Sequence, residues 1–358
     1  MSPVLSTVRL HPSGRSVDCE SGRTVLEALE KSGYALPNNC RAGACGECKV
    51  KVRSGSFDQG FVMDMALSQD ERRQGYGLMC MAKPLSEELV IEWGTADAKP
   101  KLFPPRENQW YVVTDRQART ARIVELRMRP LGAPMRYWPG QYVMLGGGAT
   151  GVPARSYSVA NAPRDDGELV LQITRQDDGV TSKWAHETLW PGTQLSVSGP
   201  YGTFIGDPAV ETPVLCLAAG SGLAPILSLA EAALRRGYKE PVTLMFSGRE
   251  PQDLYDSGLM AWWAAKHRGF RYRPTLTGDT VPPDWAGLRG RIPALLPTLF
   301  KDLSSTSVFA AGSPAFVDDC VAAVKALGAR PERIHTEGYF PQQPPQVPEA
   351  SQMVDGGR

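Results

Sequence analysis

The stretch Cys40-Arg41-Ala42-Gly43-Ala44-Cys45-Gly46-Glu47-Cys48 decides the fold of the first part of this chain, and its partner is Cys80, far downstream. The spacing is C-x4-C-x2-C followed by one distant cysteine. Three thiolates must converge from one tight loop, so the backbone has to wrap the bound group and aim N–H groups at the sulfurs. Gly43 and Gly46 suit this task because glycine allows positive φ and close approach of the backbone. We therefore expect four thiolate ligands: Cys40, Cys45, Cys48 and Cys80.

This spacing is that of plant-type [2Fe–2S] ligation. A structural zinc ion is the alternative, because zinc also takes four thiolates. Zinc modules usually pair two short C-x2-C knuckles, whereas this loop has a four-residue gap, a three-to-one division of ligands and interleaved small residues. The pattern favours the [2Fe–2S] cluster over zinc.

Length and composition indicate an ordinary multidomain protein. A chain of 358 residues predicts two or three domains. With a net charge of +1, 42% hydrophobic and 22% charged residues, it gives no reason to expect a nucleic acid or an anionic membrane as partner. Four of the seven cysteines belong to the cluster motif, and we expect Cys19, Cys216 and Cys320 to be isolated core residues. Such usage, with no visible secretory signal, predicts a cytoplasmic protein.

One uncharged stretch of eighteen residues, 213–230, is long enough to suggest a membrane span. Gly220-Ser221-Gly222 and Pro225 interrupt it. We expect instead a buried strand over 214–218, a glycine turn, and a helix that starts at Pro225. The sequence therefore predicts no membrane segment here.

Changes of pattern along the chain predict three domains. Residues 1–94 combine a hairpin, a helix, the cysteine loop and late strands, as in a compact α+β domain. Residues 95–108 form a proline-containing linker. Short alternating strands over 109–208 predict a small antiparallel β-barrel. Hydrophobic strands alternating with helices over 209–340 predict an α/β domain with a parallel sheet. We expect residues 341–358, rich in Pro and Gln, to be a disordered tail.

Two motifs in the barrel region favour a flavin. In Arg155-Ser156-Tyr157-Ser158 at a strand start, Tyr157 supplies an aromatic face for the ring, Ser158 a hydroxyl near N5, and Arg155 a cation for the phosphates. Gly179-Val180-Thr181-Ser182 precedes a short helix expected over 183–189, whose N-terminal N–H groups suit a pyrophosphate. The plain alternative is a barrel strand with a surface arginine and an ordinary helix cap.

Two glycine turns in the last region suggest a dinucleotide site. Gly220-Ser221-Gly222-Leu223-Ala224-Pro225 lies between a buried strand and a helix, and Gly312-Ser313-Pro314 repeats that arrangement. A lone G-x-G is a weak signal, shared by many plain turns. Both turns together are expected at the carboxyl ends of parallel strands, where open α/β sheets bind ligands.

Taken together, residues 3–340 resemble the reductase components of multicomponent oxygenases, such as the benzoate dioxygenase and methane monooxygenase reductases. The likeness rests on the four cysteines and on five motifs. These motifs begin at Arg155, at Gly179, at Gly199 (Gly199-Pro200-Tyr201-Gly202), at Gly220 and at Gly312. It implies a β-grasp ferredoxin domain, an FAD-binding barrel and a nicotinamide-nucleotide domain. It also implies that Glu337, with Tyr339 and Phe340, lies close to the flavin or nicotinamide. Ala311 stands where family members commonly have cysteine, which puts in doubt how tightly the nicotinamide is held.

The expected function is therefore that of an enzyme, an iron–sulfur flavoprotein oxidoreductase. It would take a hydride from NADH onto FAD, with Tyr157, Ser158 and Glu337 as catalytic residues, and pass single electrons through the cluster to a Rieske or di-iron oxygenase component. Gly248 and Arg249 are expected at the nucleotide, and the following Glu250 and Asp253 favour NADH over NADPH. Two alternatives stay open: the same electron chain serving another acceptor, such as a deoxysugar dehydratase system, or a non-enzymatic ferredoxin-like or zinc-stabilised module.

Overall fold

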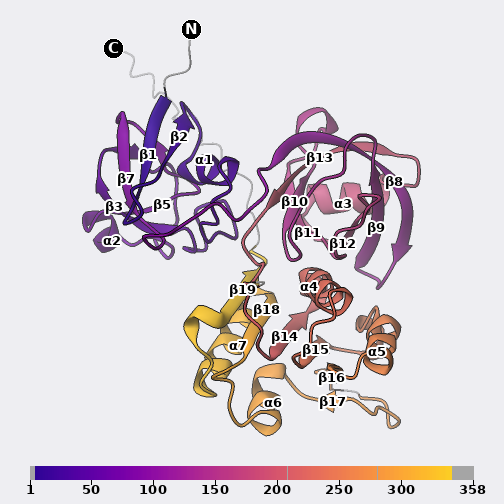
Figure 1. Ribbon diagram of the computed structural model, residues 1–358. Coiled ribbons are helices and arrows are strands. Elements are labelled where there is room, and N and C mark those ends of the chain that lie inside the picture. The colour runs from indigo at the N-terminus through magenta and orange to yellow at the C-terminus, as the bar shows by residue number, and fades with distance from the viewer. Residues whose placement is uncertain (1–4, 208, 280, 341–358) are drawn as a thin grey trace, which may run out of the picture.

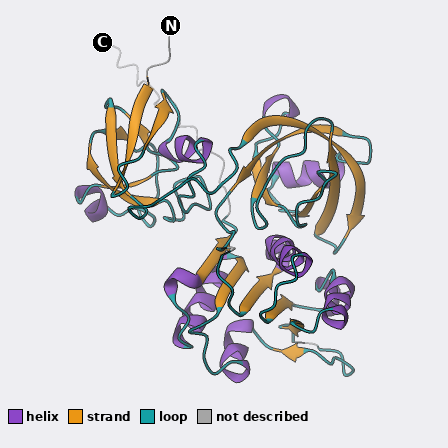
Figure 2. Cartoon of the chain, in the orientation of Figure 1, coloured by secondary structure: helices purple, strands orange, loops and turns teal. Residues whose placement is uncertain are grey.

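The computed structural model describes residues 5–207, 209–279 and 281–340, and the expected tail 341–358 lies outside them. Three main sheets follow one another along the chain. Figure 1 shows them as three lobes, with the N-terminal lobe beside the barrel and the C-terminal lobe next to both. Figure 2 shows strands in every lobe and most of the helices in the C-terminal one.

The N-terminal lobe is a five-stranded mixed sheet of order β2-β1-β7-β3-β5, in which β1 and β7 are parallel and the other neighbours antiparallel. A capping box starts α1, because the Thr24 side chain accepts from the Glu27 N–H while the Glu27 carboxylate accepts from the Thr24 N–H. Leu26 and Leu29 of that helix are buried in one cluster with Val8 and Leu10 of the sheet. A helix held against a mixed sheet in this way confirms the α+β prediction. The elements are β1 (Leu5–His11), β2 (Ser16–Glu20), α1 (Val25–Lys31), β3 (Lys49–Ser54), β4 (Phe57–Asp58), α2 (Gln69–Arg73), β5 (Tyr76–Leu78), β6 (Lys83–Pro84) and β7 (Glu88–Glu92).

The second lobe is a six-stranded antiparallel sheet of order β11-β10-β13-β8-β9-β12. An antiparallel bridge between Val159 and Leu171 joins its two edges, so the sheet closes into the predicted barrel. The elements are β8 (Arg106–Ala118), β9 (Ile123–Pro130), β10 (Tyr142–Leu145), β11 (Arg155–Ser158), β12 (Leu169–Thr174), α3 (Val180–Glu187) and β13 (Gln194–Tyr201).

The third lobe is a six-stranded parallel sheet of order β17-β16-β15-β14-β18-β19, as the alternation of strands and helices predicted. The order reverses at β14, so the chain winds outward from it in both directions. The elements are β14 (Val214–Ala219), α4 (Leu223–Arg235), β15 (Val242–Gly248), α5 (Ser257–Lys266), β16 (Phe270–Leu276), β17 (Leu288–Arg289), α6 (Ile292–Leu299), β18 (Ser307–Gly312), α7 (Pro314–Ala326) and β19 (Ile334–Gly338).

Three element boundaries differ from the sequence-based expectation. β8 begins at Arg106, inside the range expected as linker, because its first residues pair with β13 and the Asn108 N–H donates to Ser198 Oγ at 2.9 Å. α3 begins at Val180 rather than at 183. α4 begins at Leu223, and Pro225 fits inside its first turn because no helical acceptor exists there for its missing N–H.

The uncharged stretch 213–230 contains β14, a glycine turn and the first part of α4. Among residues 5–207, 209–279 and 281–340, no helix has the length and apolar character needed to cross a bilayer.

A buried ion pair joins the cysteine loop to α1 and brings it against the barrel. The Arg41 guanidinium donates to both carboxylate oxygens of Glu30, at 2.6 and 2.7 Å, and the Glu30 side chain is only 3% exposed. The same guanidinium lies 4.6 Å from the ring centroid of Tyr201 in β13. The Tyr142 hydroxyl of β10 donates to Asn38 Oδ1 at 3.4 Å. The loop is thus fixed from two sides.

Replacing Glu30 by alanine should destabilise the N-terminal domain by about 3–5 kcal/mol, because it leaves the Arg41 charge buried without a carboxylate. Native-state hydrogen exchange of the α1 amides measures this change. Glu20→Ala is the matched control, because it removes an ion pair of the same 2.6 Å length that is exposed, with Lys31 and Glu20 side chains 69% and 45% accessible. Equal exchange rates in the two variants would contradict a stabilising role for the buried pair.

Candidate functional site

The four predicted ligand cysteines come together as two pairs. Cys40 lies within hydrogen-bonding reach of Cys45, and Cys48 of Cys80. Among the described residues, no three His, Cys, Asp or Glu side chains gather around a single point. A structural zinc needs its four ligands around one ion, whereas a two-iron cluster takes thiolates at two centres. The paired arrangement therefore fits [2Fe–2S] better than zinc.

Backbone N–H groups point at these sulfurs as the glycine-containing loop predicted. The N–H groups of Ala42 and Ala44 each donate to Cys40 Sγ at 3.4 Å, and the Cys80 N–H donates to Cys48 Sγ at the same distance. The hydrogen bond shared with Cys45 raises the pKa of Cys45 and, together with the first two N–H groups, lowers the pKa of Cys40 to about 5. This environment favours the thiolate, which is the ligand form.

The other three cysteines behave as core residues. Burial raises the pKa of Cys19 to about 11 and those of Cys216 and Cys320 to about 12. All three are buried free thiols. This confirms that they stand apart from the ligand set.

The barrel places both flavin motifs at one end of β11. The Thr181 hydroxyl at the start of α3 donates to the carbonyl of Pro153, two residues before Arg155. The Ser182 hydroxyl donates to the Gly179 carbonyl and accepts from the Gln176 N–H. A Cβ at Gly179 would come within 2.4 Å of Ser182 Oγ, so this tight loop requires glycine. The hydroxyls of Thr181 and Ser182 thus shape the loop, as does the Gly179 N–H, which donates to the Gln176 carbonyl at 3.1 Å. The N–H of Val180 at the start of α3 and the Arg155 cation are the groups suited to phosphates.

Strand alternation separates the side chains of β11. Tyr157 is half-buried and packs against the barrel core together with Trp184. Ser156 Oγ lies 3.3 Å from Met144 Sδ of the neighbouring strand β10. Ser158, at the strand end, is buried and points toward the third lobe. Tyr157 and Ser158 therefore lie on opposite faces of β11, with the aromatic ring against the barrel core and the hydroxyl at the junction with the third lobe.

The predicted nucleotide loops lie at the carboxyl ends of three neighbouring parallel strands, β14, β15 and β18. Gly220–Gly222 follows β14, Gly248 ends β15 and Arg249 follows it, and Gly312-Ser313-Pro314 spans the end of β18 and the start of α7. A Cβ at Gly222 would lie 2.1 Å from the Ala311 carbonyl oxygen, so only glycine lets these two loops approach. Ala311 is fully buried at that contact. These ends of a parallel sheet are where a dinucleotide binds.

A buried polar network joins the barrel to the third lobe between these two sites. The Ser158 hydroxyl donates to the Glu337 carboxylate and lies 3.1 Å from the Tyr339 hydroxyl. Tyr339 Oη in turn donates to the Ser221 carbonyl at 3.4 Å. Burial raises the pKa of Glu337 to about 7, although hydrogen bonds from Ser158 and Tyr339 oppose the shift. Glu337 can therefore hold or release a proton near neutral pH where the two predicted cofactor sites meet.

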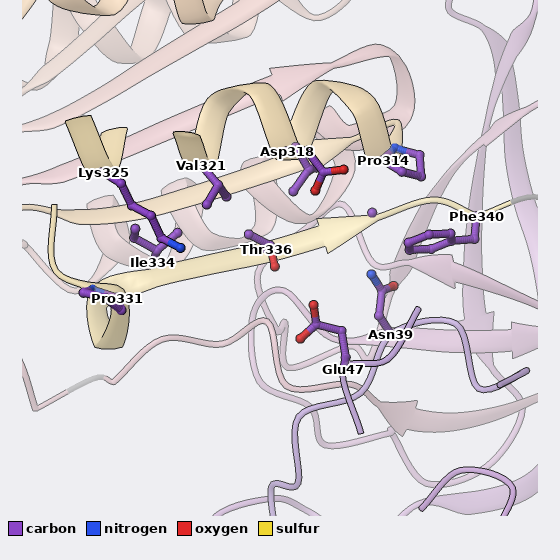
Figure 3. Close-up of a pocket in the computed structure, with 12 residues that line it drawn as sticks. Asn39, Glu47, Pro314, Asp318, Val321, Lys325, Pro331, Ile334, Thr336 and Phe340 are labelled. Atoms are coloured by element: carbon purple, nitrogen blue, oxygen red, sulfur yellow. The ribbon is translucent and has the colours of Figure 1, made fainter. Parts of the chain in front are cut away.

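A cavity of about 240 Å³ lies between the cysteine loop and the third lobe. Figure 3 shows the residues that line it. Asn39 and Glu47 of the loop face Thr336 and Phe340 across it. Phe340, expected at a cofactor, thus lies between the third lobe and the residue preceding Cys40. The loop, the barrel and the nucleotide-binding sheet converge at this place.

Sequence reasoning missed several residues that position the site. Arg41 belongs to the quoted loop, but nothing in the spacing predicts its pairing with Glu30 or its contact with Tyr201. The buried Tyr255 donates from its hydroxyl to the Gly220 carbonyl at 3.0 Å and so supports the first nucleotide turn. Its signal in the sequence is a single aromatic residue after β15, which identifies no role.

Comparisons with known protein families match each lobe. Residues 8–85 match the 2Fe-2S iron-sulfur cluster binding domain, 114–205 the oxidoreductase FAD-binding domain, and 216–322 the oxidoreductase NAD-binding domain. The cofactors of this chain are therefore a [2Fe–2S] cluster, FAD and NAD(H).

Several relatives match nearly the whole chain. The reductase subunit of an aromatic O-demethylase from Amycolatopsis is 36% identical, over 94% of this chain and 99% of its own length. The reductase component of the naphthalene 1,2-dioxygenase system from Pseudomonas putida is 32% identical, over 93% of this chain and 98% of its own. The solved structure of a cytochrome P450 reductase from Amycolatopsis is 33% identical, covers 94% of this chain and 99% of its own, and superposes with a TM-score of 0.83. The chain belongs to the family of iron–sulfur flavoprotein reductases that take electrons from NAD(P)H and supply them to oxygenase components.

Proposed function

We propose that this chain oxidises NADH and delivers single electrons to a cytochrome P450-type oxygenase component. The observation that carries the electron path is the fixed contact between the cysteine loop and the barrel, together with the Ser158–Glu337–Tyr339 network beside the nucleotide loops. When bound, FAD accepts the two electrons of a hydride, and the cluster changes by one electron at a time. The protein's part is to hold these groups close together and away from water.

We assign each residue of the site to a cofactor according to its position in the structure. Cys40 and Cys45 would hold one iron, and Cys48 and Cys80 the other. Arg155 and the residues from Gly179 to Ser182 would hold the flavin phosphates, with Tyr157 at the ring. The three turns that begin at Gly220, Gly248 and Gly312 would hold the dinucleotide. Ser158 and Glu337 would form the polar side of the hydride-transfer site, where the carboxyl can supply or take up a proton.

Carboxylates at the end of β15 support NADH over NADPH. Asp253 Oδ2 accepts from the backbone N–H groups of Arg249 and Glu250, at 3.1 and 3.0 Å, which fixes the carboxylate in the turn after Gly248. Glu250 adds an exposed carboxylate beside it. Two negative charges at this turn would repel a 2′-phosphate.

The three cysteines outside the ligand set, Cys19, Cys216 and Cys320, are buried free thiols, which supports a reducing compartment, and we propose the cytoplasm. The domains we propose are the predicted ones, 1–94, 109–208 and 209–340, with β8 taking over the last residues of the 95–108 linker.

The P450-type acceptor is supported by the similarity over 94% of this chain to the solved cytochrome P450 reductase from Amycolatopsis. Rieske and di-iron components are the other oxygenase classes that this electron chain would suit. A second candidate is a deoxysugar dehydratase-type acceptor. It is supported by the reductase of such a system from Yersinia pseudotuberculosis, which is 30% identical over 87% of this chain and 91% of its own.

An acceptor panel tests this choice. Purified P450, Rieske and di-iron oxygenase components and a deoxysugar dehydratase are each mixed with the holoenzyme, with NADH or with NADPH, and the rate of acceptor reduction is measured. We expect the highest catalytic efficiency with the P450 and a preference for NADH. Faster reduction of another acceptor class, or a preference for NADPH, would overturn the corresponding part of the proposal.

Replacing Cys45 by serine should abolish the visible absorbance of the cluster and the reduction of cytochrome c. NADH-driven reduction of ferricyanide, which needs only the flavin and nucleotide sites, should keep its rate. Cys320→Ser is the control, because Cys320 is a buried free thiol in the third lobe. Loss of both activities in Cys45→Ser would contradict the proposal that cytochrome c reduction needs the cluster whereas ferricyanide reduction does not.

Replacing Arg155 by alanine should yield protein depleted in FAD, because it removes the cation proposed for the phosphates. The flavin-to-protein ratio after gel filtration measures the effect, and we expect at least a tenfold weaker flavin affinity. Arg129→Ala, which removes an exposed barrel arginine paired with Asp166, should keep full occupancy. An Arg155→Ala protein with full flavin content would remove this residue from the phosphate site.

A further inference from the structure

The cysteine loop has three sides, and the structure describes what lies on each. Asn38 and Arg41 face the barrel through Tyr142 and Tyr201. Asn39 and Glu47 face the third lobe across the cavity of Figure 3. On the remaining side, Gly43 and Gly46 are backed by the segment 61–66 of the loop's own domain.

This third side carries two large apolar side chains in solvent. Phe61 is 75% exposed and Met65 is 83% exposed. Their segment touches the loop closely: a Cβ at Gly43 would lie 2.9 Å from the Phe61 carbonyl oxygen, and one at Gly46 would lie 3.3 Å from that of Ala66. The Met63 N–H also donates to the Gly43 carbonyl at 3.0 Å. The backbone of the segment that carries these two exposed apolar side chains therefore lies directly against the ligand loop.

We infer that this surface, the Phe61–Met65 patch, is where a one-electron-accepting protein docks to collect the electron from the cluster. The inference rests on the proposed function and adds its exit point. Electron transfer requires close approach of the two redox centres, and the other two sides of the loop already face domains of this chain. Cys45 is the most exposed of the four ligands, since Cys40, Cys48 and Cys80 are all buried, and it directly precedes Gly46 on the patch side.

The chemistry of the patch specifies its partner. Asp64, between the two apolar residues, is paired with Arg72 at 3.2 Å, so the segment presents one charge of each sign here and no excess of either. Attraction then comes from burial of Phe61 and Met65 rather than from charge, and aromatic residues and methionine are favoured anchors in protein interfaces. The partner is thus an iron protein whose own redox centre lies beneath an apolar face, such as the exposed edge of a haem.

The test compares Phe61→Ser/Met65→Ser with Leu85→Ser in the holoenzyme, using cytochrome c as the probe acceptor. Leu85 is 69% exposed on the same domain, and its N–H donates to Ser56 rather than to the ligand loop. We expect the double variant to raise the KM for cytochrome c at least tenfold. The factor should be the same at low and at high salt. Each single variant should raise the KM by a smaller factor. Ferricyanide reduction and the absorbance of the NADH-reduced cluster should match those of the unmodified chain, which also shows that the variant is folded.

An unchanged KM in the double variant, or an equal rise in Leu85→Ser, would overturn the inference. So would a loss of self-association in the double variant with unchanged cytochrome c kinetics, because the patch would then be an interface between copies of this chain. Failure of the proposed function has a different signature, since the cluster of the unmodified chain would then stay oxidised when NADH is added.

Discussion

The buried ion pair between Arg41 and Glu30 fixes the residue next to the first cluster ligand, and the electron path depends on that constraint. An electron can pass between two bound groups only if the protein holds them close together. Glu30 of α1 secures the loop from inside its own domain, while Tyr201 and Tyr142 contact it from the barrel. The Arg41 side chain thus connects the core of the N-terminal domain to the barrel and helps to fix the two domains relative to each other.

The barrel and the third lobe are held together by buried polar contacts of a similar kind. The Ser228 hydroxyl of α4 donates to the Asn161 carbonyl at 2.7 Å, and the Ala162 N–H donates to Glu231 at 2.8 Å. Asn161 and Ala162 come just after β11 in the chain, so these two contacts help to fix the position at which Ser158 meets Glu337. Because buried polar groups are costly to leave unpaired, these bonds favour one orientation of the two domains over others.

Much of this architecture was predictable, because the motifs report local backbone geometry. The cysteine spacing requires a tight loop, the alternating pattern over 109–208 indicates the strands of the barrel, and glycine turns after hydrophobic strands mark the ends of β14 and β18. What the sequence did not reveal is long-range. The pairing of Arg41 with Glu30, the support of Gly220 by Tyr255 and the side of the loop that meets solvent all depend on how domains pack. Glu337 and Tyr339 were expected at the site only through family resemblance, since no local pattern distinguishes them.

The place of β19 has a consequence for how the molecule is made. Glu337 and Tyr339 come almost last in the described chain, yet they complete the junction between the barrel and the nucleotide-binding sheet. Domains generally fold in order as they leave the ribosome. The cluster domain and the barrel can therefore mature while the chain is still being synthesised, but the junction cannot close until Glu337 and Tyr339 have been translated. A prematurely terminated chain would thus retain its electron-carrying domain and lack the closed site that feeds it.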